Sequence, residues 1–574
     1  MTSKTPLVNL LIPLERPDRR RFVRQVAWGA AALGGLSLSA CGGSSGDPQV
    51  SFDHGVASGD PLADRVVLWT RVSTADTREI ALTWEVARDS SFNTIVARGE
   101  TRTSAARDHT VKVDVGGLVA GTRYWYRFSA YGATSPVGRT RTLPGAGASQ
   151  VRLAVFSCSN YPAGYFNVYA EAARRDDLDA TVHLGDYMYE YGRDGYASED
   201  AGALGRLSEP AAEIVQLADY RRRYAQYRSD PDLQALHAAA PMIAVWDDHE
   251  IANDTWLDGA ENHQPDEGDF AVRRAAAIQA YHEWMPIRSA TPERIYRSFD
   301  FGGLVALHML DTRVIGRAEQ LSYERFFTSA GLDGAAFAAA MGDASRQLLG
   351  AEQMAWLQQQ MATSSATWQM LGQQVLMGRM NIPAPLLMDF LSPGSGTSLP
   401  GYSALLNKAS TAPQTLTPQE QAILAQPAIP YNLDAWDGYP VAREMVLQTA
   451  RALDKNLVVL AGDTHNAWAS DLLDAEQHQV GVEFATSSVS SPGFEEYLAE
   501  QDPAVLAASL TQLVDPLRYC DTARRGYMVV TATPAECRAE WIYVSTVKSR
   551  SYTVTTDKVL KVLPGAAERR IVAA

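Results

Sequence analysis

The pattern of hydrophobic and polar positions changes along the chain at about residue 148. Before that point, aromatic and β-branched runs such as residues 65–72, 81–86 and 124–128 alternate with turn residues, and no helical period is present. Short runs separated by turns are typical of antiparallel strands. A Gly-Ala-Gly-Ala-Ser stretch at 145–149 marks the boundary. We therefore predict that residues 51–147 form a β domain.

The turn near residue 120 narrows this prediction. Residues 118–124, Leu-Val-Ala-Gly-Thr-Arg-Tyr, resemble the tyrosine corner of immunoglobulin-like and fibronectin-type sandwiches. The expected fold of this region is therefore an N-terminal β-sandwich domain. It can act in packing or in substrate gating, and packing is the simpler role.

From residue 148 to residue 574 the pattern alternates between strand-length apolar runs and helical periods. Such alternation indicates an α/β domain in which helices cover a sheet. The stretch 383–432 is rich in Pro, Ser, Thr and Gly, and we expect a long surface excursion there. The predicted strands are residues 153–156, 180–184, 242–246, 304–310, 368–375 and 457–461, and the predicted helices are 165–175, 220–229, 271–284 and 352–362.

Residues 1–40 have the pattern of an export signal. Arg19-Arg20-Arg21-Phe22-Val23-Arg24 matches the twin-arginine motif, and the apolar run 26–40 follows it. This run is shorter than the roughly 20 residues that a bilayer span needs. It ends in Leu38-Ser39-Ala40-Cys41, which resembles a lipobox, so we expect Cys41 to be lipidated and residues 41–50 to form a flexible tether. A cleavable signal without lipid is the alternative.

This signal predicts the location and partners of the protein. We expect twin-arginine export to the periplasm or the cell surface, attachment to the membrane through a lipid anchor, and a monomer. The net charge of -15 argues against a non-specific nucleic-acid binder, which needs a basic face. It does not exclude a phosphate-bearing substrate, because bound cations reverse the local field.

The chain has four cysteines, of which Cys41 is the predicted lipid site and Cys158 belongs to a polar cluster described below. Cys520 and Cys537 remain, and an oxidising compartment would let them form a disulfide. Sequence alone does not establish that connectivity.

Four polar clusters each close an apolar run. They are Cys158, Asp186-Tyr187-Met188-Tyr189, Asp247-Asp248-His249-Glu250 and Asp463-Thr464-His465. Each has an ordinary explanation when taken alone, such as a packed cysteine, an aromatic rim or an acidic N-cap. Their joint occurrence at strand ends predicts one metal site, because ligands of open α/β sheets lie outside the carboxyl ends of the strands.

The types of donor atom also limit which metal ions fit this site. Thiolate, phenolate, imidazole and carboxylate together do not match a structural zinc site. Phenolate and carboxylate favour a hard trivalent ion such as Fe(III), and the surplus carboxylates suit Ca²⁺, Mg²⁺ or Mn²⁺. Adjacent cations of this kind suit phosphate-ester hydrolysis. His249 can then serve as a general acid or as a hydrogen-bond donor to phosphate.

Six motifs follow one another along the chain. They are Phe156-Ser157-Cys158-Ser159-Asn160-Tyr161, Gly185-Asp186-Tyr187-Met188-Tyr189-Glu190, Trp246-Asp247-Asp248-His249-Glu250, Leu310-Asp311-Thr312-Arg313, Trp436-Asp437-Gly438-Tyr439 and Gly462-Asp463-Thr464-His465. In this order they resemble the PhoD family of alkaline phosphatases and phosphodiesterases. The resemblance spans about residues 50–550 and implies a four-layer αββα metallophosphatase domain related to purple acid phosphatases, with Fe(III) and one or two Ca²⁺ ions.

The resemblance assigns roles to individual residues. The implied Fe(III) ligands are Cys158, Asp186, Tyr189 and His465, with Asp186 bridging to calcium. Asp463 and one or both of Asp247 and Asp248 are the implied calcium ligands. Asp186 and His249 are the catalytic candidates, with His249 near the leaving group.

Two residues are candidates for binding the substrate. Asn253 is one of them, although the family often has paired asparagines where this chain has Asn253-Asp254. Arg313 either contacts phosphate or forms a structural ion pair with Asp311.

The sequence therefore predicts an exported metal-dependent phosphatase or phosphodiesterase, in which a metal-bound hydroxide attacks a phosphate ester. A phospholipase D-type phosphodiesterase is the alternative within this class. An alternative of another class is a non-catalytic surface lipoprotein with a degenerate phosphatase domain. Mono- or diester preference is left open.

Overall fold

The computed structural model describes residues 47–288, 291–328, 331–391 and 394–574. The predicted twin-arginine motif, the apolar run, Cys41 and most of the tether lie outside these residues. No helix within the described ranges has both the length and the apolar character that a membrane span requires.

The larger of two central sheets has ten strands. Its middle strands β9, β10 and β11 run parallel, whereas β23 pairs antiparallel with β9. In spatial order the strands are β26 (Val572–Ala573), β25 (Val554–Val562), β24 (Cys537–Val544), β23 (Arg525–Ala532), β9 (Val151–Phe156), β10 (Ala180–His183), β11 (Met242–Ala244), β1 (Val56–Gly59), β2 (Val66–Arg71) and β5 (Thr110–Val115).

The second central sheet has seven strands. Its strands β13, β16, β19 and β21 are parallel to one another, and β12 and β20 run antiparallel to their neighbours. In spatial order they are β12 (Arg297–Phe301), β13 (Val305–Met309), β16 (Trp368–Gly372), β19 (Leu457–Ala461), β21 (Gln479–Ala485), β20 (Ala467–Leu473) and β22 (Leu517–Asp521).

One hydrophobic core joins the two central sheets. Leu153 and Val182 of the ten-stranded sheet belong to the same buried cluster as Val458 and Phe484 of the seven-stranded sheet. A second core lies on the other side of the seven-stranded sheet, where Val459 packs with side chains of α7 and α11. The alternation of Val458 and Val459 between the cores follows from the two-residue period of a strand. This explains why the predicted strands are continuously apolar.

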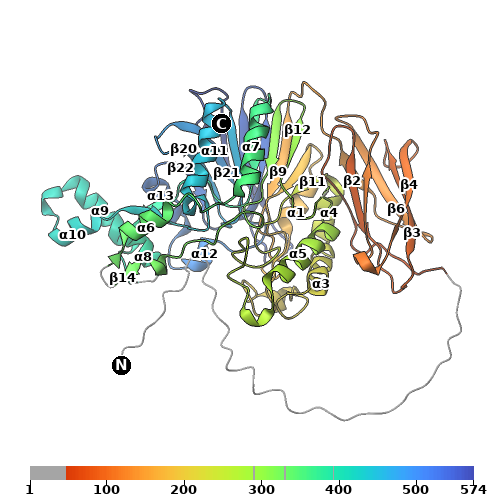
Figure 1. Cartoon of the computed structure of the whole chain (residues 1–574), viewed down its shortest axis with the longest axis horizontal. Coiled ribbons are helices and arrows are strands. Elements are labelled where there is room, and N and C mark those ends of the chain that lie inside the picture. Colours follow the sequence, from red (N-terminus) through yellow and green to blue (C-terminus); the bar gives the residue numbers. More distant parts are fainter. Residues whose placement is uncertain (1–46, 289–290, 329–330, 392–393) are drawn as a thin grey trace, which may run out of the picture.

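Helices lie on the outside of the sheets (Figure 1). Helices α1, α3, α4 and α5 gather beside the ten-stranded sheet, and α7 and α11 lie against the seven-stranded one. The helices are α1 (Asn167–Ala173), α2 (Ala201–Leu204), α3 (Leu217–Arg228), α4 (Pro231–Ala239), α5 (Phe270–Trp284), α6 (Gly334–Met341), α7 (Gly350–Thr363), α8 (Ala384–Leu391), α9 (Leu399–Thr411), α10 (Pro418–Leu424), α11 (Pro440–Ala452), α12 (Phe494–Tyr497) and α13 (Pro503–Leu513).

The N-terminal region shares a sheet with the rest of the chain. Strands β1, β2 and β5 extend the ten-stranded sheet, because β1 pairs parallel with β11. Facing them is a separate five-stranded sheet, and the two share a core that includes Leu68, Val86 and Phe128. This sheet contains β3 (Ile80–Ala87), β4 (Ile95–Thr103), β6 (Arg123–Ala130), β7 (Ala133–Thr134) and β8 (Gly138–Arg141).

The turn that resembled a tyrosine corner has the expected contact. The hydroxyl of Tyr124 accepts a hydrogen bond of 2.9 Å from the backbone N–H of Val119. However, the division at residue 147 falls between strands of one continuous sheet, which local sequence patterns do not reveal.

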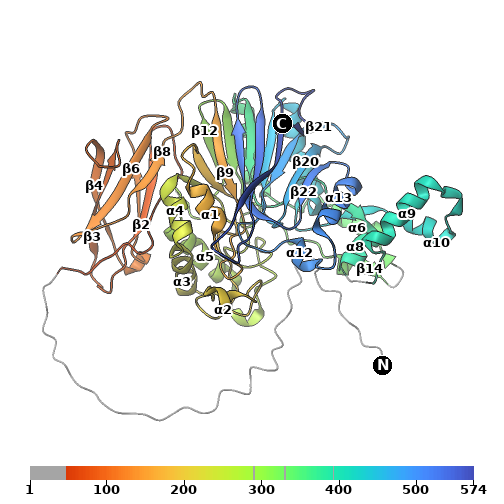
Figure 2. The ribbon, with the colours of Figure 1, turned by 180° about the vertical axis from the view of Figure 1, so that it is seen from behind.

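The stretch predicted as a surface excursion contains regular structure. It holds α8, α9 and α10 and begins and ends at a small sheet of β17 (Asn381–Pro383) and β18 (Ala428–Pro430). A second small sheet pairs β14 (Phe327–Thr328) with β15 (Gly331–Leu332). Helices α9 and α10 project from one end of the molecule, opposite the five-stranded sheet (Figure 2). Pro and Thr residues therefore mark helix starts here, as at Thr417-Pro418, rather than irregular coil.

The predicted disulfide is absent. Cys520 and Cys537 are both free and buried. Cys520 lies on β22 of the seven-stranded sheet and Cys537 on β24 of the ten-stranded sheet. Their proximity in sequence therefore does not bring them into one sheet, and that prediction was wrong.

Candidate active site

The four predicted polar clusters meet where parallel strands of both central sheets end. Cys158, Asp186 and Asp247 follow β9, β10 and β11, and Asp463 and His465 follow β19. Cys158, Asp186, Asp463 and His465 have φ values of 60°, 54°, 65° and 63°. Non-glycine residues adopt this left-handed conformation uncommonly, and such positions cluster at functional sites. The backbone therefore turns sharply at each of these strand ends.

Two glycines allow the loops to approach one another. A Cβ atom on Gly185 would lie 2.4 Å from the Cβ of Asp247, and one on Gly462 would lie 2.2 Å from Oγ of Ser157. The second contact joins loops of the two different sheets. Gly185 also has a φ of 110°, which disfavours other residues.

The first group of donors brings together the four predicted Fe(III) ligands. Ligand atoms of Cys158, Asp186 and His465 lie within 4.8 Å of one another, and all three residues are buried. The hydroxyl of Tyr189 lies 3.1 Å from Oδ2 of Asp186 and 3.1 Å from Nε2 of His465. The prediction that Tyr189 faces this centre, rather than only the crevice rim, matches its position.

Two further groups continue from the first, the second sharing Asp186 with the first and the third sharing Asp248 with the second. Asp186, Asp248 and His249 form one, and Asp247, Asp248 and Asp463 form the other. Asp186 therefore belongs to two groups, which suits a bridging carboxylate. Oδ1 of Asp186 and Oδ2 of Asp247 are buried and have no hydrogen-bond partner. Unpaired buried carboxylate oxygens are costly unless a cation binds them, so these residues fit the expected metals.

Arg313 lies behind these carboxylates rather than on the wall of the pocket. Its guanidinium is fully buried and donates to Asp434 at 2.8 Å, to Asp463 at 3.0 Å and to Asp247. The predicted contact of Arg313 with substrate therefore does not fit the structure. The alternative ion pair with Asp311 is also not formed, because the guanidinium pairs with other acids, and Asp311 accepts from Arg313 only through the backbone N–H. The carboxylates that hold this guanidinium inside the protein are those of Asp247, Asp248, Asp434 and Asp463.

Two glutamates that the sequence did not single out as site residues organise the site. Glu250 accepts backbone hydrogen bonds from Asp186 and Tyr187 after β10 and from Asp247 after β11. It therefore ties the two strand ends together. The one indication of this role in the sequence is that Glu250 is the last residue of the Asp-Asp-His-Glu motif.

Glu190 holds the imidazole of His249. Its carboxylate lies 2.7 Å from Nδ1 of His249, and it also accepts from the backbone N–H of Asn253 and from Nδ2 of Asn262. Because the carboxylate accepts at Nδ1, Nε2 of His249 is left for other partners. Nothing about a glutamate directly after Tyr189 predicts this role from sequence.

Burial raises the pKa of most acids in the site. It raises the pKa of Asp186 and Asp463 well above their usual range and that of Asp247 to about 7. Burial also acts to raise the pKa of Asp248, but the charges of Arg313 and His249 outweigh it and lower this pKa to about 2. Carboxylates this close together repel one another when ionised. Bound cations would offset this repulsion.

The pKa values of His465 and His249 are shifted in opposite directions. Burial lowers the pKa of His465 to about 3, so its imidazole is neutral, as a metal ligand must be. Burial lowers the pKa of His249 as well, but Glu190 and Asp186 outweigh it and raise that pKa well above its usual value. The surrounding carboxylates therefore favour the protonated, hydrogen-bond-donating form of His249.

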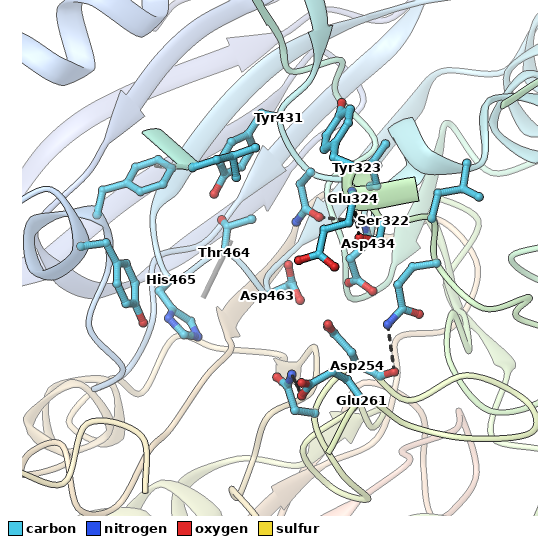
Figure 3. A pocket seen from close by; sticks show the side chains of 18 of the residues that line it. Asp254, Glu261, Ser322, Tyr323, Glu324, Tyr431, Asp434, Asp463, Thr464 and His465 are labelled. Atoms are coloured by element: carbon cyan, nitrogen blue, oxygen red, sulfur yellow. Dashed lines mark hydrogen bonds between the residues drawn. The ribbon is translucent and has the colours of Figure 1, made fainter. Parts of the chain in front are cut away.

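A pocket of about 260 Å³ opens beside these groups. Asp463 and His465 form part of its wall, and Asn253, Asp254 and Glu261 form another part (Figure 3). Asn253 is buried, its Oδ1 has no partner, and it lines the pocket, so its position matches the predicted contact with substrate. Tyr323, Phe327, Met388 and Leu391 add an apolar side.

Comparison with known proteins adds independent evidence. Residues 153–541 match the family model described as PhoD-like phosphatase, and residues 38–144 match the model of the N-terminal domain of PhoD-like phosphatases. The chain belongs to the PhoD-like phosphatase family. It is 35% identical over 559 residues to alkaline phosphatase D of Bacillus subtilis (strain 168), covering 91% of this chain and 84% of that protein.

A solved structure supports the same conclusion. The structure of PhoD superposes with a TM-score of 0.74 at 32% identity and covers 93% of this chain and 94% of its own. The PhoD-like family predicted from the motifs is thus confirmed, as are the mixed α/β fold and phosphatase activity. PhoD-like phosphatases depend on metals, and the grouped donors described above are where this member can hold them.

Proposed function

We propose that this phosphatase is an Fe(III)- and Ca²⁺-dependent enzyme that hydrolyses phosphomonoesters, phosphodiesters or both. The observation that carries the proposal is the sharing of Asp186 and Asp248 among three donor groups, which suits cations placed side by side. Every residue of these groups is buried except Asp463, which is half-buried. Mn²⁺ or Mg²⁺ can replace Ca²⁺ in sites made of carboxylates.

The residues divide between the two kinds of metal. Cys158, Asp186, Tyr189 and His465 would hold Fe(III), since thiolate and phenolate suit it better than Ca²⁺. Asp247, Asp248 and Asp463, with Asp186 as the bridge, would hold the divalent ion. When bound, these cations supply positive charge for the phosphoryl oxygens and activate a water molecule.

The protein's own residues position the substrate and move the proton. Hydrolysis adds a hydroxyl to phosphorus and breaks the P–O bond to the alcohol, which leaves with a proton. His249 would donate that proton from Nε2, because Glu190 fixes Nδ1. The side-chain amide of Asn253, on the wall of the pocket, would donate a hydrogen bond to the substrate or accept one from it.

Metal analysis of the enzyme, exported by its native route, tests this proposal. We expect iron and a divalent ion in the protein, and visible colour from thiolate and tyrosinate on Fe(III). Asp186→Ala should reduce hydrolysis of 4-nitrophenyl phosphate and of bis(4-nitrophenyl) phosphate at least a thousandfold. The exposed Asp515→Asn is the control and should keep wild-type activity. Colourless, iron-free protein that is fully active would refute the metal assignment.

A phospholipase D-type diesterase is a second candidate, favoured by the apolar side of the pocket at Phe327, Met388 and Leu391. Comparing turnover of phosphatidylcholine vesicles with turnover of the two aryl esters distinguishes it. The non-catalytic alternative finds no support, because every predicted donor is present and grouped.

We also propose export and anchoring. The twin-arginine motif and Cys41 support a lipid-anchored protein at the periplasmic side or the cell surface. Metabolic labelling with a fatty acid tests this idea, and Cys41→Ala should abolish the label.

Finally, the two central sheets with helices outside them support a four-layer αββα domain next to an N-terminal β-sandwich.

A further inference from the structure

The guanidinium of Arg228 is a buried charge for which the described residues supply no counter-ion. Arg228 is the last residue of α3 and is fully buried. Its Nη2 donates to the backbone carbonyl of His54 at 3.4 Å, whereas Nε and Nη1 have no hydrogen-bond partner. No carboxylate in the described part of the chain forms an ion pair with it. A buried charge without a partner is strongly unfavourable.

Other arginines that are buried to the same degree do find acceptors. Arg273 and Arg313 pair with carboxylates, and Arg223 donates to three backbone carbonyls. Burial acts to lower the pKa of both Arg228 and Arg313, but the carboxylates around Arg313 outweigh it, whereas the pKa of Arg228 stays below its usual value. Arg228 is therefore unusual among the buried arginines in lacking both kinds of partner.

Stacking on an aromatic ring does not replace these partners. Cζ of Arg228 lies 4.1 Å from the ring centroid of Trp69. The N–H donors of a guanidinium point outward in its plane, so a ring that covers one face of the group leaves the donors unsatisfied.

Two further unpaired donors lie in the same region. Ser58 on β1 and Tyr126 on β6 are fully buried, and neither hydroxyl has a hydrogen-bond partner. Burial raises the pKa of Tyr126, and the neighbouring Ser58 and Arg228 act in the opposite direction, which places the three side chains beside one another. Helix α4, which follows α3, packs against β1 and β8 (Figure 1), so this region joins the N-terminal strands to the helices.

The titratable groups around Arg228 do not supply a negative charge. Burial raises the pKa of Tyr187 to about 12, so its hydroxyl is neutral near pH 7. Burial lowers the pKa of His54 to about 3 and that of His237 well below its usual value, so both imidazoles are neutral as well. The other cation acting on His54 is Arg71, which pairs with Asp108 at 2.9 Å. One positive charge is therefore left without compensation.

We propose that a small monovalent anion, such as chloride, binds beside Arg228 and accepts hydrogen bonds from its guanidinium and from the hydroxyls of Ser58 and Tyr126. A water molecule can accept the same hydrogen bonds, but it carries no charge and leaves the guanidinium uncompensated. The anion joins β1 and β6 of the N-terminal region to α3. This inference depends neither on the metals nor on the substrate of the proposed function.

Thermal unfolding of the exported holoenzyme tests for this anion. Chloride replaces gluconate at constant ionic strength, so that the screening of surface charges stays the same. We expect the midpoint of unfolding to rise with chloride and then to level off, as it does when a ligand binds only the folded state. Bromide should give the same saturable rise. Equal midpoints in chloride and gluconate would overturn the proposal.

Arg228→Met removes the charge and keeps a flexible apolar side chain against Trp69. This variant should lose the chloride dependence. In gluconate it should be at least as stable as the wild type, because no buried charge is then left uncompensated. The control Arg222→Met lies on the same helix, is exposed, and should keep the full chloride effect. A chloride effect that persists in Arg228→Met would arise at another site and would contradict the proposal.

Tyr126→Phe provides a second test that does not depend on the folding of the arginine variant. Loss of one hydrogen bond to the anion should raise the half-saturating chloride concentration about tenfold. The midpoint in gluconate should change little, because the hydroxyl has no other partner. An unchanged half-saturating concentration would show that the anion does not bind at Tyr126.

Crystals of the wild type grown in bromide locate the ion directly. We expect an anomalous peak in contact with Nε or Nη1 of Arg228 and with the hydroxyl of Tyr126. An ordered water molecule at this position, without anomalous signal, would mean that the guanidinium is hydrated rather than paired with an anion, and the inference would fail.

Discussion

At the scale of single residues, the site depends on which partner each polar atom finds. Cys158, Asp186, Tyr189 and His465 come from three separate segments and face one another, as the motif resemblance implied. For Arg313 the sequence offered only Asp311 as an ion-pair partner, whereas the carboxylates to which its guanidinium donates lie 66 to 150 residues away along the chain. No local pattern indicates such partners.

Glu190 provides a prediction at this scale. Glu190→Gln should lower kcat for an aryl phosphate about ten- to a hundredfold, because His249 loses the carboxylate that orients it. Iron and divalent-ion content should stay at the wild-type level, which separates orientation from metal loss. Glu199→Gln, an exposed neighbour, serves as the control. Unchanged kcat in Glu190→Gln would mean that His249 needs no such partner.

At the scale of elements, the strand ends determine where the donors meet. The apolar runs predicted as strands correspond to β9, β10, β11, β13, β16 and β19, because a strand buried on both faces is apolar throughout. The stretch 383–432 projects at the surface as predicted, but its composition resembles that of a loop and does not reveal its helices, which have few buried residues. Elements packed in a core are therefore the ones that the sequence reveals.

Gly185 tests the close approach of β10 and β11. Gly185→Ala should lower the free energy of unfolding by about 2–4 kcal/mol, since the new methyl group meets Asp247 and φ is positive. Gly117→Ala is the matched control, because Gly117 also has positive φ but nothing lies within 4 Å of its Cβ position. It should cost only about 1 kcal/mol. Urea denaturation measures both, and equal costs would show that the contact is not tight.

At the scale of the whole molecule, the N-terminal region is joined to the rest by a shared sheet. Lys112 of β5 illustrates the contact, since its ammonium group donates to the backbone carbonyl of Ile287 at 3.2 Å. Burial, helped by Arg297, lowers the pKa of Lys112 from 10.5 to about 8. The folded state therefore releases this proton at lower pH than the unfolded state.

The sign of the resulting pH effect follows directly. Between about pH 8 and 10.5 the unfolded chain holds a proton on Lys112 that the folded protein lacks. Stability relative to Lys112→Met should therefore rise with pH across this window, by up to about 3 kcal/mol. Urea denaturation of both proteins at pH 7.5 and pH 10 measures the difference. A constant difference would contradict the lowered pKa.

The placement of the cysteines gives a second prediction for the whole molecule. Cys520 and Cys537 are buried in different sheets, so both should remain thiols after export. Peptide mapping after alkylation in denaturant without reductant should find both residues alkylated. A peptide pair linked through Cys520 and Cys537 would contradict this arrangement.

The sequence by itself determined the family, the α/β alternation and the donors, because strand burial and ligand chemistry leave local traces in residue types and spacing. Only the tertiary structure decided that the N-terminal strands extend the central sheet, that Arg313 lies among acids, and that Cys520 and Cys537 are apart. These are contacts between residues far apart in the chain, and their energies depend on distance and burial that no local pattern encodes.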